Sequence, residues 1–284
     1  MNRRYVNWTS TLWVYLIAIL LLLIASPVQA DGYRLPQFRE VPGSPAKLPE
    51  MPASETVSLI GDADFAPYSF VSQGGGPAGM AVELALAACT EAKLRCEIKL
   101  MAFDQLLPAL AQGTADLVIS GPRLDQAANA GAFMTRPWFR TMARFAVLSG
   151  SPLTASTAPA LRGKRIGVAK DTLHARWLET YYGASEIVTF DDDARAREAL
   201  RTGGIEAYFG DNLLTIYWVA GPAAQGCCRL LDGAYTDFDH FSRNLAFLTA
   251  RDDLRAAFDF GLDAAQQKGI TEKIFNTYVP LSPW

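Results

Sequence analysis

Short apolar runs alternate with amphipathic segments through most of the chain, and this alternation limits the fold more than any other feature of the sequence. The runs have the length of strands, and the segments between them carry apolar residues at a spacing of three to four. The strand-like runs are TVSLIGDA, CEIKLMAF, ADLVIS, MARFAVLS, GKRIGVAK, EIVTFD, IEAYFGD and NLAFLTA. Such alternation predicts an α/β fold of βαβ units around mostly parallel sheets.

The alternation occurs twice, with the polar link GSPLTASTAPALRG between the two series. We therefore predict two lobes, residues 55–149 plus 244–284 and residues 150–243, each a mostly parallel sheet flanked by helices. Ligands bind where strand ends of open α/β sheets meet loops, so the expected ligand cleft lies between the lobes. In the second lobe, either Asp171 or Thr172 is expected to cap the helix DTLHARWLETYYG.

The first 54 residues are expected to lie outside the folded core. Residues 1–30 combine two early arginines, the apolar run TLWVYLIAILLLLIA and a small-residue site ending at Ala30, which is typical of a cleaved secretory signal peptide. An uncleaved membrane anchor is the alternative. Residues 31–54 contain five prolines and no periodicity, which predicts an extended, poorly ordered arm.

Composition and motifs exclude several classes of function. The formal charge of −3 on a 284-residue chain lacks the net positive charge that is typical of a nucleic-acid-binding protein. The sequence has no G-x-S-x-G elbow, no Walker motif and no metal spacing among its two histidines and four cysteines. We therefore expect no catalytic residues, no metal and no cofactor. The arginines of TRPWFRTMARF, which are Arg136, Arg140 and Arg144, are expected at the surface.

The four cysteines all follow the predicted signal peptide, in a compartment where disulfides persist. Cys89 and Cys96 stand at a predicted helix end and strand start, and they can be bridged if their Cα atoms lie within about 7 Å. Cys227 and Cys228 are adjacent. Free thiols and a vicinal disulfide both stay open for them, and we favour two small residues in a loop.

The order of these segments resembles that of the family 3 extracellular solute-binding proteins, the periplasmic receptors of polar amino acid ABC transporters. The resemblance runs from about Val57 to Tyr278. It is carried by DADFAPYSF, GMAVELALA, FDQLLPALAQGTADLVIS, LRGKRIGVAKDT, ALRTGGIEAYFGD and LRAAFDFGLDAAQQKGITEKIFNTYV. It implies a two-lobed type II periplasmic binding protein, a monomer in the periplasm whose partners are a small solute and a membrane permease. Cys89 and Cys96 coincide with a disulfide of the family's cationic amino acid receptors.

The resemblance also implies a ligand site in the first lobe. Phe65 and Phe103 match two aromatic positions that sandwich the ligand side chain, and such a pair suits an alkyl chain or a cation. The alternative is that both are ordinary core aromatics. Asp62 matches an acidic position that receives a basic side chain, and the alternative is a solvated loop carboxylate.

Three further positions follow from the same resemblance. Asp211 matches the carboxylate that pairs with the ligand α-ammonium, although it also stands where it could cap the next helix. Ser120 matches a polar residue of the first-lobe loop. Thr172 matches a residue that helps bind the ligand carboxylate at a helix start, where anions are favoured; capping alone is the alternative.

The family's carboxylate clamp is not in its usual place. In the family, the loop after ADLVIS has the form Ser-x-Ser-x-Thr-x-x-Arg, and the arginine binds the α-carboxylate through two hydrogen bonds. The matching residue here is Ala128, with Asp125 at the threonine place and Arg123 at the middle serine place. Three hypotheses follow: Arg123 replaces the clamp, the solute is an amine without a carboxylate, or solute binding has been lost.

The sequence thus predicts a binding protein that works by hinge closure, with hinges near Leu148–Ser151 and Asp239–Asn244. The alternative is an accessory protein of a periplasmic quinoprotein alcohol dehydrogenase that no longer binds amino acids. Some members of this fold are dehydratases, but a general acid and base cannot be placed from this sequence, so an enzyme is not expected.

Overall fold

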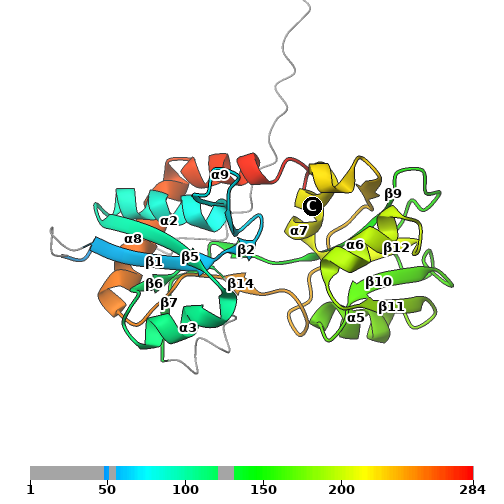
Figure 1. Cartoon of the computed structure of the whole chain (residues 1–284), viewed down its shortest axis with the longest axis horizontal. Helices are drawn as coiled ribbons and strands as arrows, with labels where there is room; N and C mark the ends of the chain where they lie inside the picture. The colour runs from blue at the N-terminus through cyan, green and yellow to red at the C-terminus, as the bar shows by residue number, and fades with distance from the viewer. Residues whose placement is uncertain (1–47, 51–55, 121–130, 284) are drawn as a thin grey trace, which may run out of the picture. The chain divides into compact units, whose positions relative to one another are not determined.

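The computed structural model describes residues 48–50, 56–120 and 131–283, and these contain the predicted alternation of strands and helices (Figure 1). The predicted signal peptide, nearly all of the proline-rich arm and Arg123 lie outside the described residues. In the part of the chain that is described, we find no helix with the length and apolar character to cross a membrane.

The first sheet has five strands in the order β5-β1-β6-β15-β7. Strand β1 runs parallel to β5 and β6, whereas β15 is antiparallel to β6 and β7. The strands are β1 (Thr56–Asp62), β5 (Arg95–Met101), β6 (Leu117–Val118), β7 (Phe133–Met134) and β15 (Leu248–Thr249).

Helices cover the first sheet and pack on one another. Leu106 and Leu110 of α3 pack with Ile60, Val118 and Leu248 of the sheet in one buried cluster. Helices α2 and α8 lie against each other, and a Cβ at Gly261 would stand 2.2 Å from a backbone oxygen of α2, so only glycine permits this approach. The helices are α2 (Met80–Glu91), α3 (Phe103–Ala111), α8 (Asp252–Gln267) and α9 (Ile270–Tyr278).

The second sheet also has five strands, in the order β11-β10-β12-β9-β13. Strand β10 is parallel to β11 and β12, and β9 is antiparallel to β12 and β13. The strands are β9 (Ala143–Leu148), β10 (Arg165–Ala169), β11 (Glu186–Phe190), β12 (Ala207–Asp211) and β13 (Cys228–Leu230).

The two faces of the second sheet are covered by different helices because successive side chains of a strand point to opposite faces. Phe145 and Phe209 pack in one cluster with Trp177 of α5, whereas their neighbours Ala146 and Tyr208 pack in another with α6 and α7. The helical elements are α5 (Leu173–Tyr181), α6 (Asp193–Arg201), α7 (Asn212–Ala220) and the short 3₁₀ helix η1 (Pro222–Ala224).

Two small sheets complete the fold. Strands β2 (Asp64–Phe65), β3 (Ser69–Val71) and β4 (Pro77–Ala78) form one, and β8 (Phe139–Arg140) pairs with β14 (Asn244–Leu245) in the other. The pair β8 and β14 carries the chain between the two large sheets.

The predicted lobe boundaries remain a prediction, but the strand pairing bears on one of them. We placed the whole segment up to residue 149 in the first lobe, whereas β9 forms its hydrogen bonds within the second sheet. The sheets therefore divide before Ala143, near β8. Ser149, which we placed at a hinge, instead donates its backbone N–H to the Cys227 carbonyl oxygen at 2.8 Å.

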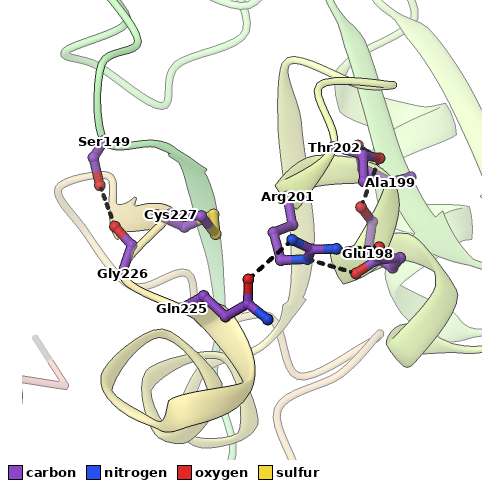
Figure 2. The surroundings of a disulfide bond; sticks show 9 residues. Ser149, Glu198, Ala199, Arg201, Thr202, Gln225, Gly226 and Cys227 are labelled. Atoms are coloured by element: carbon purple, nitrogen blue, oxygen red, sulfur yellow. Dashed lines mark hydrogen bonds and ion pairs between the residues drawn. A yellow bond between two sulfur atoms is a disulfide. The ribbon is translucent and has the colours of Figure 1, made fainter.

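Both pairs of cysteines form disulfides. Cys89 and Cys96 are joined with a Cα–Cα distance of 6.3 Å, which confirms the predicted pairing. Our preference for unpaired loop cysteines at Cys227 and Cys228 was wrong, because the two adjacent residues are joined to each other (Figure 2). Cys228 is buried and begins β13, so the pair belongs to the edge of the second sheet rather than to a free loop.

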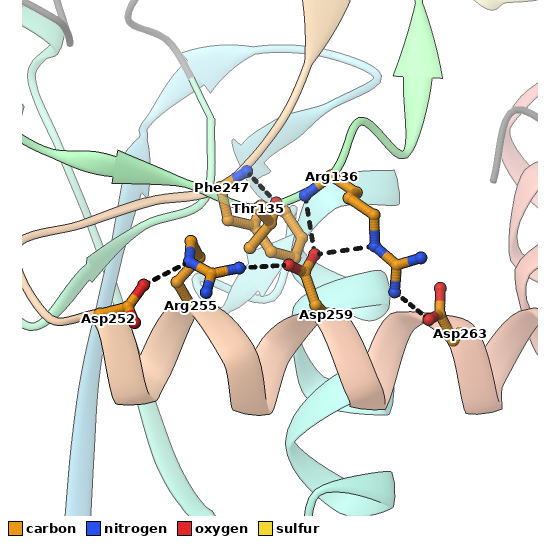
Figure 3. Close-up of polar contacts among 7 residues, drawn as sticks. All are labelled: Thr135, Arg136, Phe247, Asp252, Arg255, Asp259 and Asp263. Carbon is orange, nitrogen blue, oxygen red and sulfur yellow. Dashed lines mark hydrogen bonds and ion pairs between the residues drawn. The ribbon is translucent and has the colours of Figure 1, made fainter. Parts of the chain in front are cut away.

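A buried ion network ties the segment before β8 to α8 (Figure 3). Asp259 and Asp263 are 4% and 2% exposed. Asp259 accepts from the Arg136 backbone N–H at 2.7 Å and from Arg255 at 3.0 Å, and Asp263 pairs with the Arg136 guanidinium. Asp252, at the exposed end of the network, accepts from Arg255 at 2.6 Å. Arg136 therefore holds two parts of the fold together, in contrast to the surface role expected from sequence.

This network predicts unequal effects for two aspartates on the same helix. Asp259→Ala removes a buried acceptor from the Arg136 backbone N–H and from two half-buried guanidinium groups. We therefore expect the free energy of unfolding to fall by about 1–3 kcal/mol. Asp252→Ala removes an exposed partner of Arg255 and should cost less than about 1 kcal/mol. Urea unfolding of both variants measures the difference. Equal losses would show that Asp259 is no more important than a surface carboxylate.

Candidate functional site

A pair of serines braces the carboxyl ends of β1 and β6. Ser120 directly follows β6, and its Oγ accepts from the Asp62 backbone N–H at 3.2 Å. The Ser69 hydroxyl donates to the Asp62 carbonyl oxygen at 2.7 Å and lies 2.5 Å from Ser120 Oγ. Since a hydroxyl has one hydrogen, Ser120 must donate to Ser69. Ser120 could therefore only accept a hydrogen bond from a ligand.

Three aromatic side chains stand beside this edge. Phe65 stacks on Tyr68 with ring centroids 4.8 Å apart, and Tyr68 meets Trp138 edge to face at 6.3 Å. Tyr68 is 1% exposed and Trp138 is 6% exposed. A Cβ at Gly79, whose φ is +123°, would stand 2.4 Å from the Tyr68 carbonyl oxygen, so a glycine there allows α2 to begin against Tyr68. The aromatic group is thus fixed by the fold before any ligand arrives.

The aromatic group encloses a small cavity and leaves two polar atoms unpaired. The cavity has a volume of about 20 Å³, the space of one water molecule, and its lining includes Phe65, Tyr68, Ser120, Trp138 and Asn244. Within the described part of the chain, the Tyr68 hydroxyl and Trp138 Nε1 are buried without a hydrogen-bond partner. Such groups are costly to bury, so this is a place where a polar atom of a ligand or a water molecule would be stabilised.

Asp62 and Phe103 occupy less enclosed places. The Asp62 carboxylate is half-buried and accepts from the Asp64 backbone N–H at 3.0 Å. Phe103 begins α3 and is 45% exposed. Among the described residues it makes no ring contact with Phe65. In the predicted sandwich the solute side chain would separate the two rings, so the pairing of Phe65 with Phe103 stays a prediction.

Asp211 ends β12 and caps α7. Its Oδ1 accepts from the Leu214 backbone N–H at 3.0 Å, so Asp211 does cap α7, as the alternative interpretation predicted. The pKa of Asp211 is raised from 3.8 to about 7. Burial is the main cause and the nearby Asp193 carboxylate contributes, whereas the N–H groups at the start of α7 act in the opposite direction. The Tyr68 hydroxyl faces Asp211 without reaching hydrogen-bonding geometry, and burial followed by this charge raises the pKa of Tyr68.

Thr172 caps α5 and lines a second, larger pocket. Its Oγ1 accepts from the Ala175 backbone N–H at 3.1 Å and donates to the Ala169 carbonyl oxygen at 2.7 Å, so Thr172 rather than Asp171 is the cap. The pocket has a volume of about 520 Å³. Its lining residues are Asp171, Thr172, Leu173, His174, Arg176, Phe241 and Arg243.

The structure adds residues to the site that the sequence alone did not single out. Tyr68 and Trp138 stand in the quoted APYS and PWF segments, but nothing in the sequence signals that they meet. Arg176 and Arg243 reach the Thr172 pocket from positions 67 residues apart, which no local motif could indicate. Arg123, together with the loop that holds Asp125 and Ala128, lies outside the described residues, so its predicted role stays a prediction.

A family model and individual relatives both place this chain among solute-binding proteins. Residues 57–280 match the family described as bacterial extracellular solute-binding proteins, family 3. The putative ABC transporter arginine-binding protein 2 of Escherichia coli (strain K12) is 24% identical over 228 residues, which are 80% of this chain and 91% of that protein. The L-arginine-binding protein of Pseudomonas aeruginosa is 25% identical over 236 residues, 81% of this chain and 90% of that protein.

The fold is also that of solved structures. Substrate binding domain 2 of Lactococcus lactis GlnP, in its open conformation, has a TM-score of 0.72 and 20% identity. The match covers 82% of this chain and 98% of that domain. This likeness confirms the predicted α/β fold of two sheets flanked by helices.

The raised pKa of Asp211 predicts how stability depends on pH. The group's contribution to folding is largest below pH 3.8 and declines until the pH passes about 7, because the folded state disfavours the charged form. Asn keeps the helix cap without the charge. We expect the stability of Asp211→Asn, relative to the unchanged protein, to be about 2–3 kcal/mol higher at pH 8 than at pH 5. Urea unfolding without ligand measures the difference.

The matched control is Asp191→Asn. Asp191 is exposed, and its hydrogen bond to Lys170 lowers the pKa of its carboxyl, so it stays charged across this pH range. If Asp211→Asn shows no more pH dependence than Asp191→Asn, the Asp211 carboxylate is solvated rather than buried.

Proposed function

Because this chain belongs to the bacterial extracellular solute-binding proteins of family 3, we propose that it captures a small polar solute carrying an ammonium group and presents it to a membrane ABC transporter. The arginine-binding relatives support an amino acid or a related amine as the solute class. The proposed mechanism is hinge closure, in which the solute contacts both lobes and shifts the population to the closed state.

The observation that carries this proposal is the Asp211 carboxylate. Within the described residues, no lysine, arginine or histidine forms an ion pair with it. Asp211 is half-buried, and a carboxylate that is partly removed from water without a cation is unfavourable. An ammonium group of the solute would supply the missing charge. Phe65, which is half-buried, offers a ring surface of the kind that attracts cations. These features favour a cationic group at this end of the site.

The remaining predicted residues have narrower roles in the proposal. Phe65 contributes the aromatic wall, Phe103 an exposed ring at the start of α3, and Asp62 a second carboxylate for a basic side chain. Ser120 and Thr172 already donate their hydroxyl hydrogens within the protein, so each would accept from the solute or act through its backbone. Two alternatives remain for the end of the solute away from its ammonium group. Either Arg123 binds a carboxylate there, or the solute has no carboxylate.

The cellular setting is part of the same proposal. We propose a monomer that is exported by the signal peptide 1–30 to the periplasm, with a permease as partner and no enzymatic activity. The relatives reported above are binding proteins, and one structural neighbour is described as an ancestral amino acid-binding protein that preceded cyclohexadienyl dehydratase. Neither relative is described as an accessory of a quinoprotein dehydrogenase, and that hypothesis has no support here.

A thermal unfolding screen tests the proposal. The purified protein, freed of solute by unfolding and refolding, would be scanned with arginine, with agmatine as its decarboxylated analogue, and with succinate. A ligand at 100 times its Kd adds about 2.7 kcal/mol, which is a shift of a few degrees. Arginine alone shifting Tm, with the shift abolished in Arg123→Ala, supports the relocated clamp. Equal shifts with agmatine support an amine site. Succinate alone shifting Tm, or no shift across a wider panel of amines, would contradict the proposal.

Binding should also depend on pH through Asp211. An ammonium group binds the charged carboxylate, which is about nine-tenths populated at pH 8 and about one-tenth at pH 6 when the pKa is about 7. We therefore expect Kd to rise about tenfold from pH 8 to pH 6, measured by titration calorimetry. Asp211→Asn should bind weakly at both pH values, and Asp191→Asn should keep the tenfold change. A Kd independent of pH in the unchanged protein would remove Asp211 from the ammonium site.

A further inference from the structure

The segment that follows α9 crosses from the helices of the first sheet to the second sheet. Helix α9 packs on α2 and α8, and the chain leaves it after Tyr278. Residues 279–283 then run to the start of α7, as the last described segment in Figure 1 shows. Because β8 and β14 already connect the two sheets, this segment is a further connection between them.

The first anchor of this segment is on α2. The Tyr278 hydroxyl accepts from the Gly79 backbone N–H at 3.1 Å and hydrogen-bonds the Glu83 carboxylate. Val279 is 1% exposed, and its N–H donates to the Phe275 carbonyl oxygen at 2.9 Å. The end of α9 is therefore fixed to the first turn of α2, next to the glycine that packs against Tyr68.

The second anchor is on β9 and α7. The Arg144 guanidinium donates through Nη1 to the Ser282 carbonyl oxygen at 2.7 Å, and Asn212 Nδ2 donates to the Pro283 carbonyl oxygen at 2.7 Å. Arg144 is 6% exposed and Asn212 is 0% exposed. Buried donors need acceptors, and the tail carbonyls supply them. Arg144 was expected at the surface, and this contact with the tail is part of why it is buried.

We propose that residues 279–283 act as a strap that limits the hinge motion of the two sheets. The inference deepens the proposed function, since it concerns the motion that would enclose the solute. Five residues span at most about 17 Å when fully extended. One anchor adjoins Tyr68 through Gly79, and the other is Asn212, which directly follows Asp211. A change in the separation of these two site residues must therefore move, stretch or release the strap.

The experiment measures the motion directly in the ligand-free protein. Spin labels would be placed on non-natural residues at the exposed positions Asp104 and Glu179, since all four cysteines are in disulfides. The distance distribution is compared for the full chain and for a chain that ends at Val279. We expect a broader distribution without the strap. An unchanged distribution in a folded truncated protein would overturn the inference.

Truncation also removes the acceptors of Arg144 and Asn212, so a second variant keeps them. Inserting Gly-Ser-Gly-Ser between Pro280 and Leu281 lengthens the strap and retains both anchors. The same insertion between Gly74 and Gly75, in an exposed turn, is the control and should leave the distribution unchanged. Broadening in the strap insertion but not in the control supports a strap, and equal widths contradict it. Because no solute is added, this outcome is independent of the screen that tests the proposed function.

Discussion

The candidate site depends on one carboxylate placed where a strand becomes a helix. Asp211 ends β12 and caps α7, so its position is set by the strand pairing on one side and by the Leu214 N–H on the other. Two backbone N–H groups at a helix start partly offset the cost of burial, and the remaining cost raises the pKa of Asp211 to about 7. Among the residues that the structure describes, no cationic side chain pairs with this carboxylate.

The first-sheet side of the site is rigid for a different reason. The hydroxyls of Ser69 and Ser120 link the ends of β1 and β6 to the β2–β3 turn, and Gly79 allows α2 to begin against Tyr68. These contacts fix the aromatic group in the absence of a ligand. Preorganisation of this kind reduces the ordering cost of binding, so affinity would depend on the solute and on the hinge.

Sequence patterns predicted the helices and strands better than they predicted which strands pair and which side chains contact one another. The strand and helix order, a cap at Asp171 or Thr172 and the Cys89–Cys96 pairing follow from local periodicity, capping chemistry and a resemblance over short segments. The assignment of β9 to the first lobe failed because an apolar run shows that a strand is buried but does not show which sheet contains it. The Cys227–Cys228 disulfide was also missed, because adjacent cysteines occur in loops and in bonded pairs alike.

The sequence by itself determined the α/β class, the family and the chemical character of Asp62, Phe65, Ser120 and Asp211, because these reside in local patterns. The tertiary structure decided which of these groups contact one another and which hydroxyl hydrogens are already donated within the protein. Tyr68 lies opposite Asp211, Ser120 donates to Ser69, and Arg144 binds the chain terminus at Ser282 only because segments more than fifty residues apart fold together. Long-range packing and hydrogen-bond satisfaction have no local signature, so the folded chain alone can settle them.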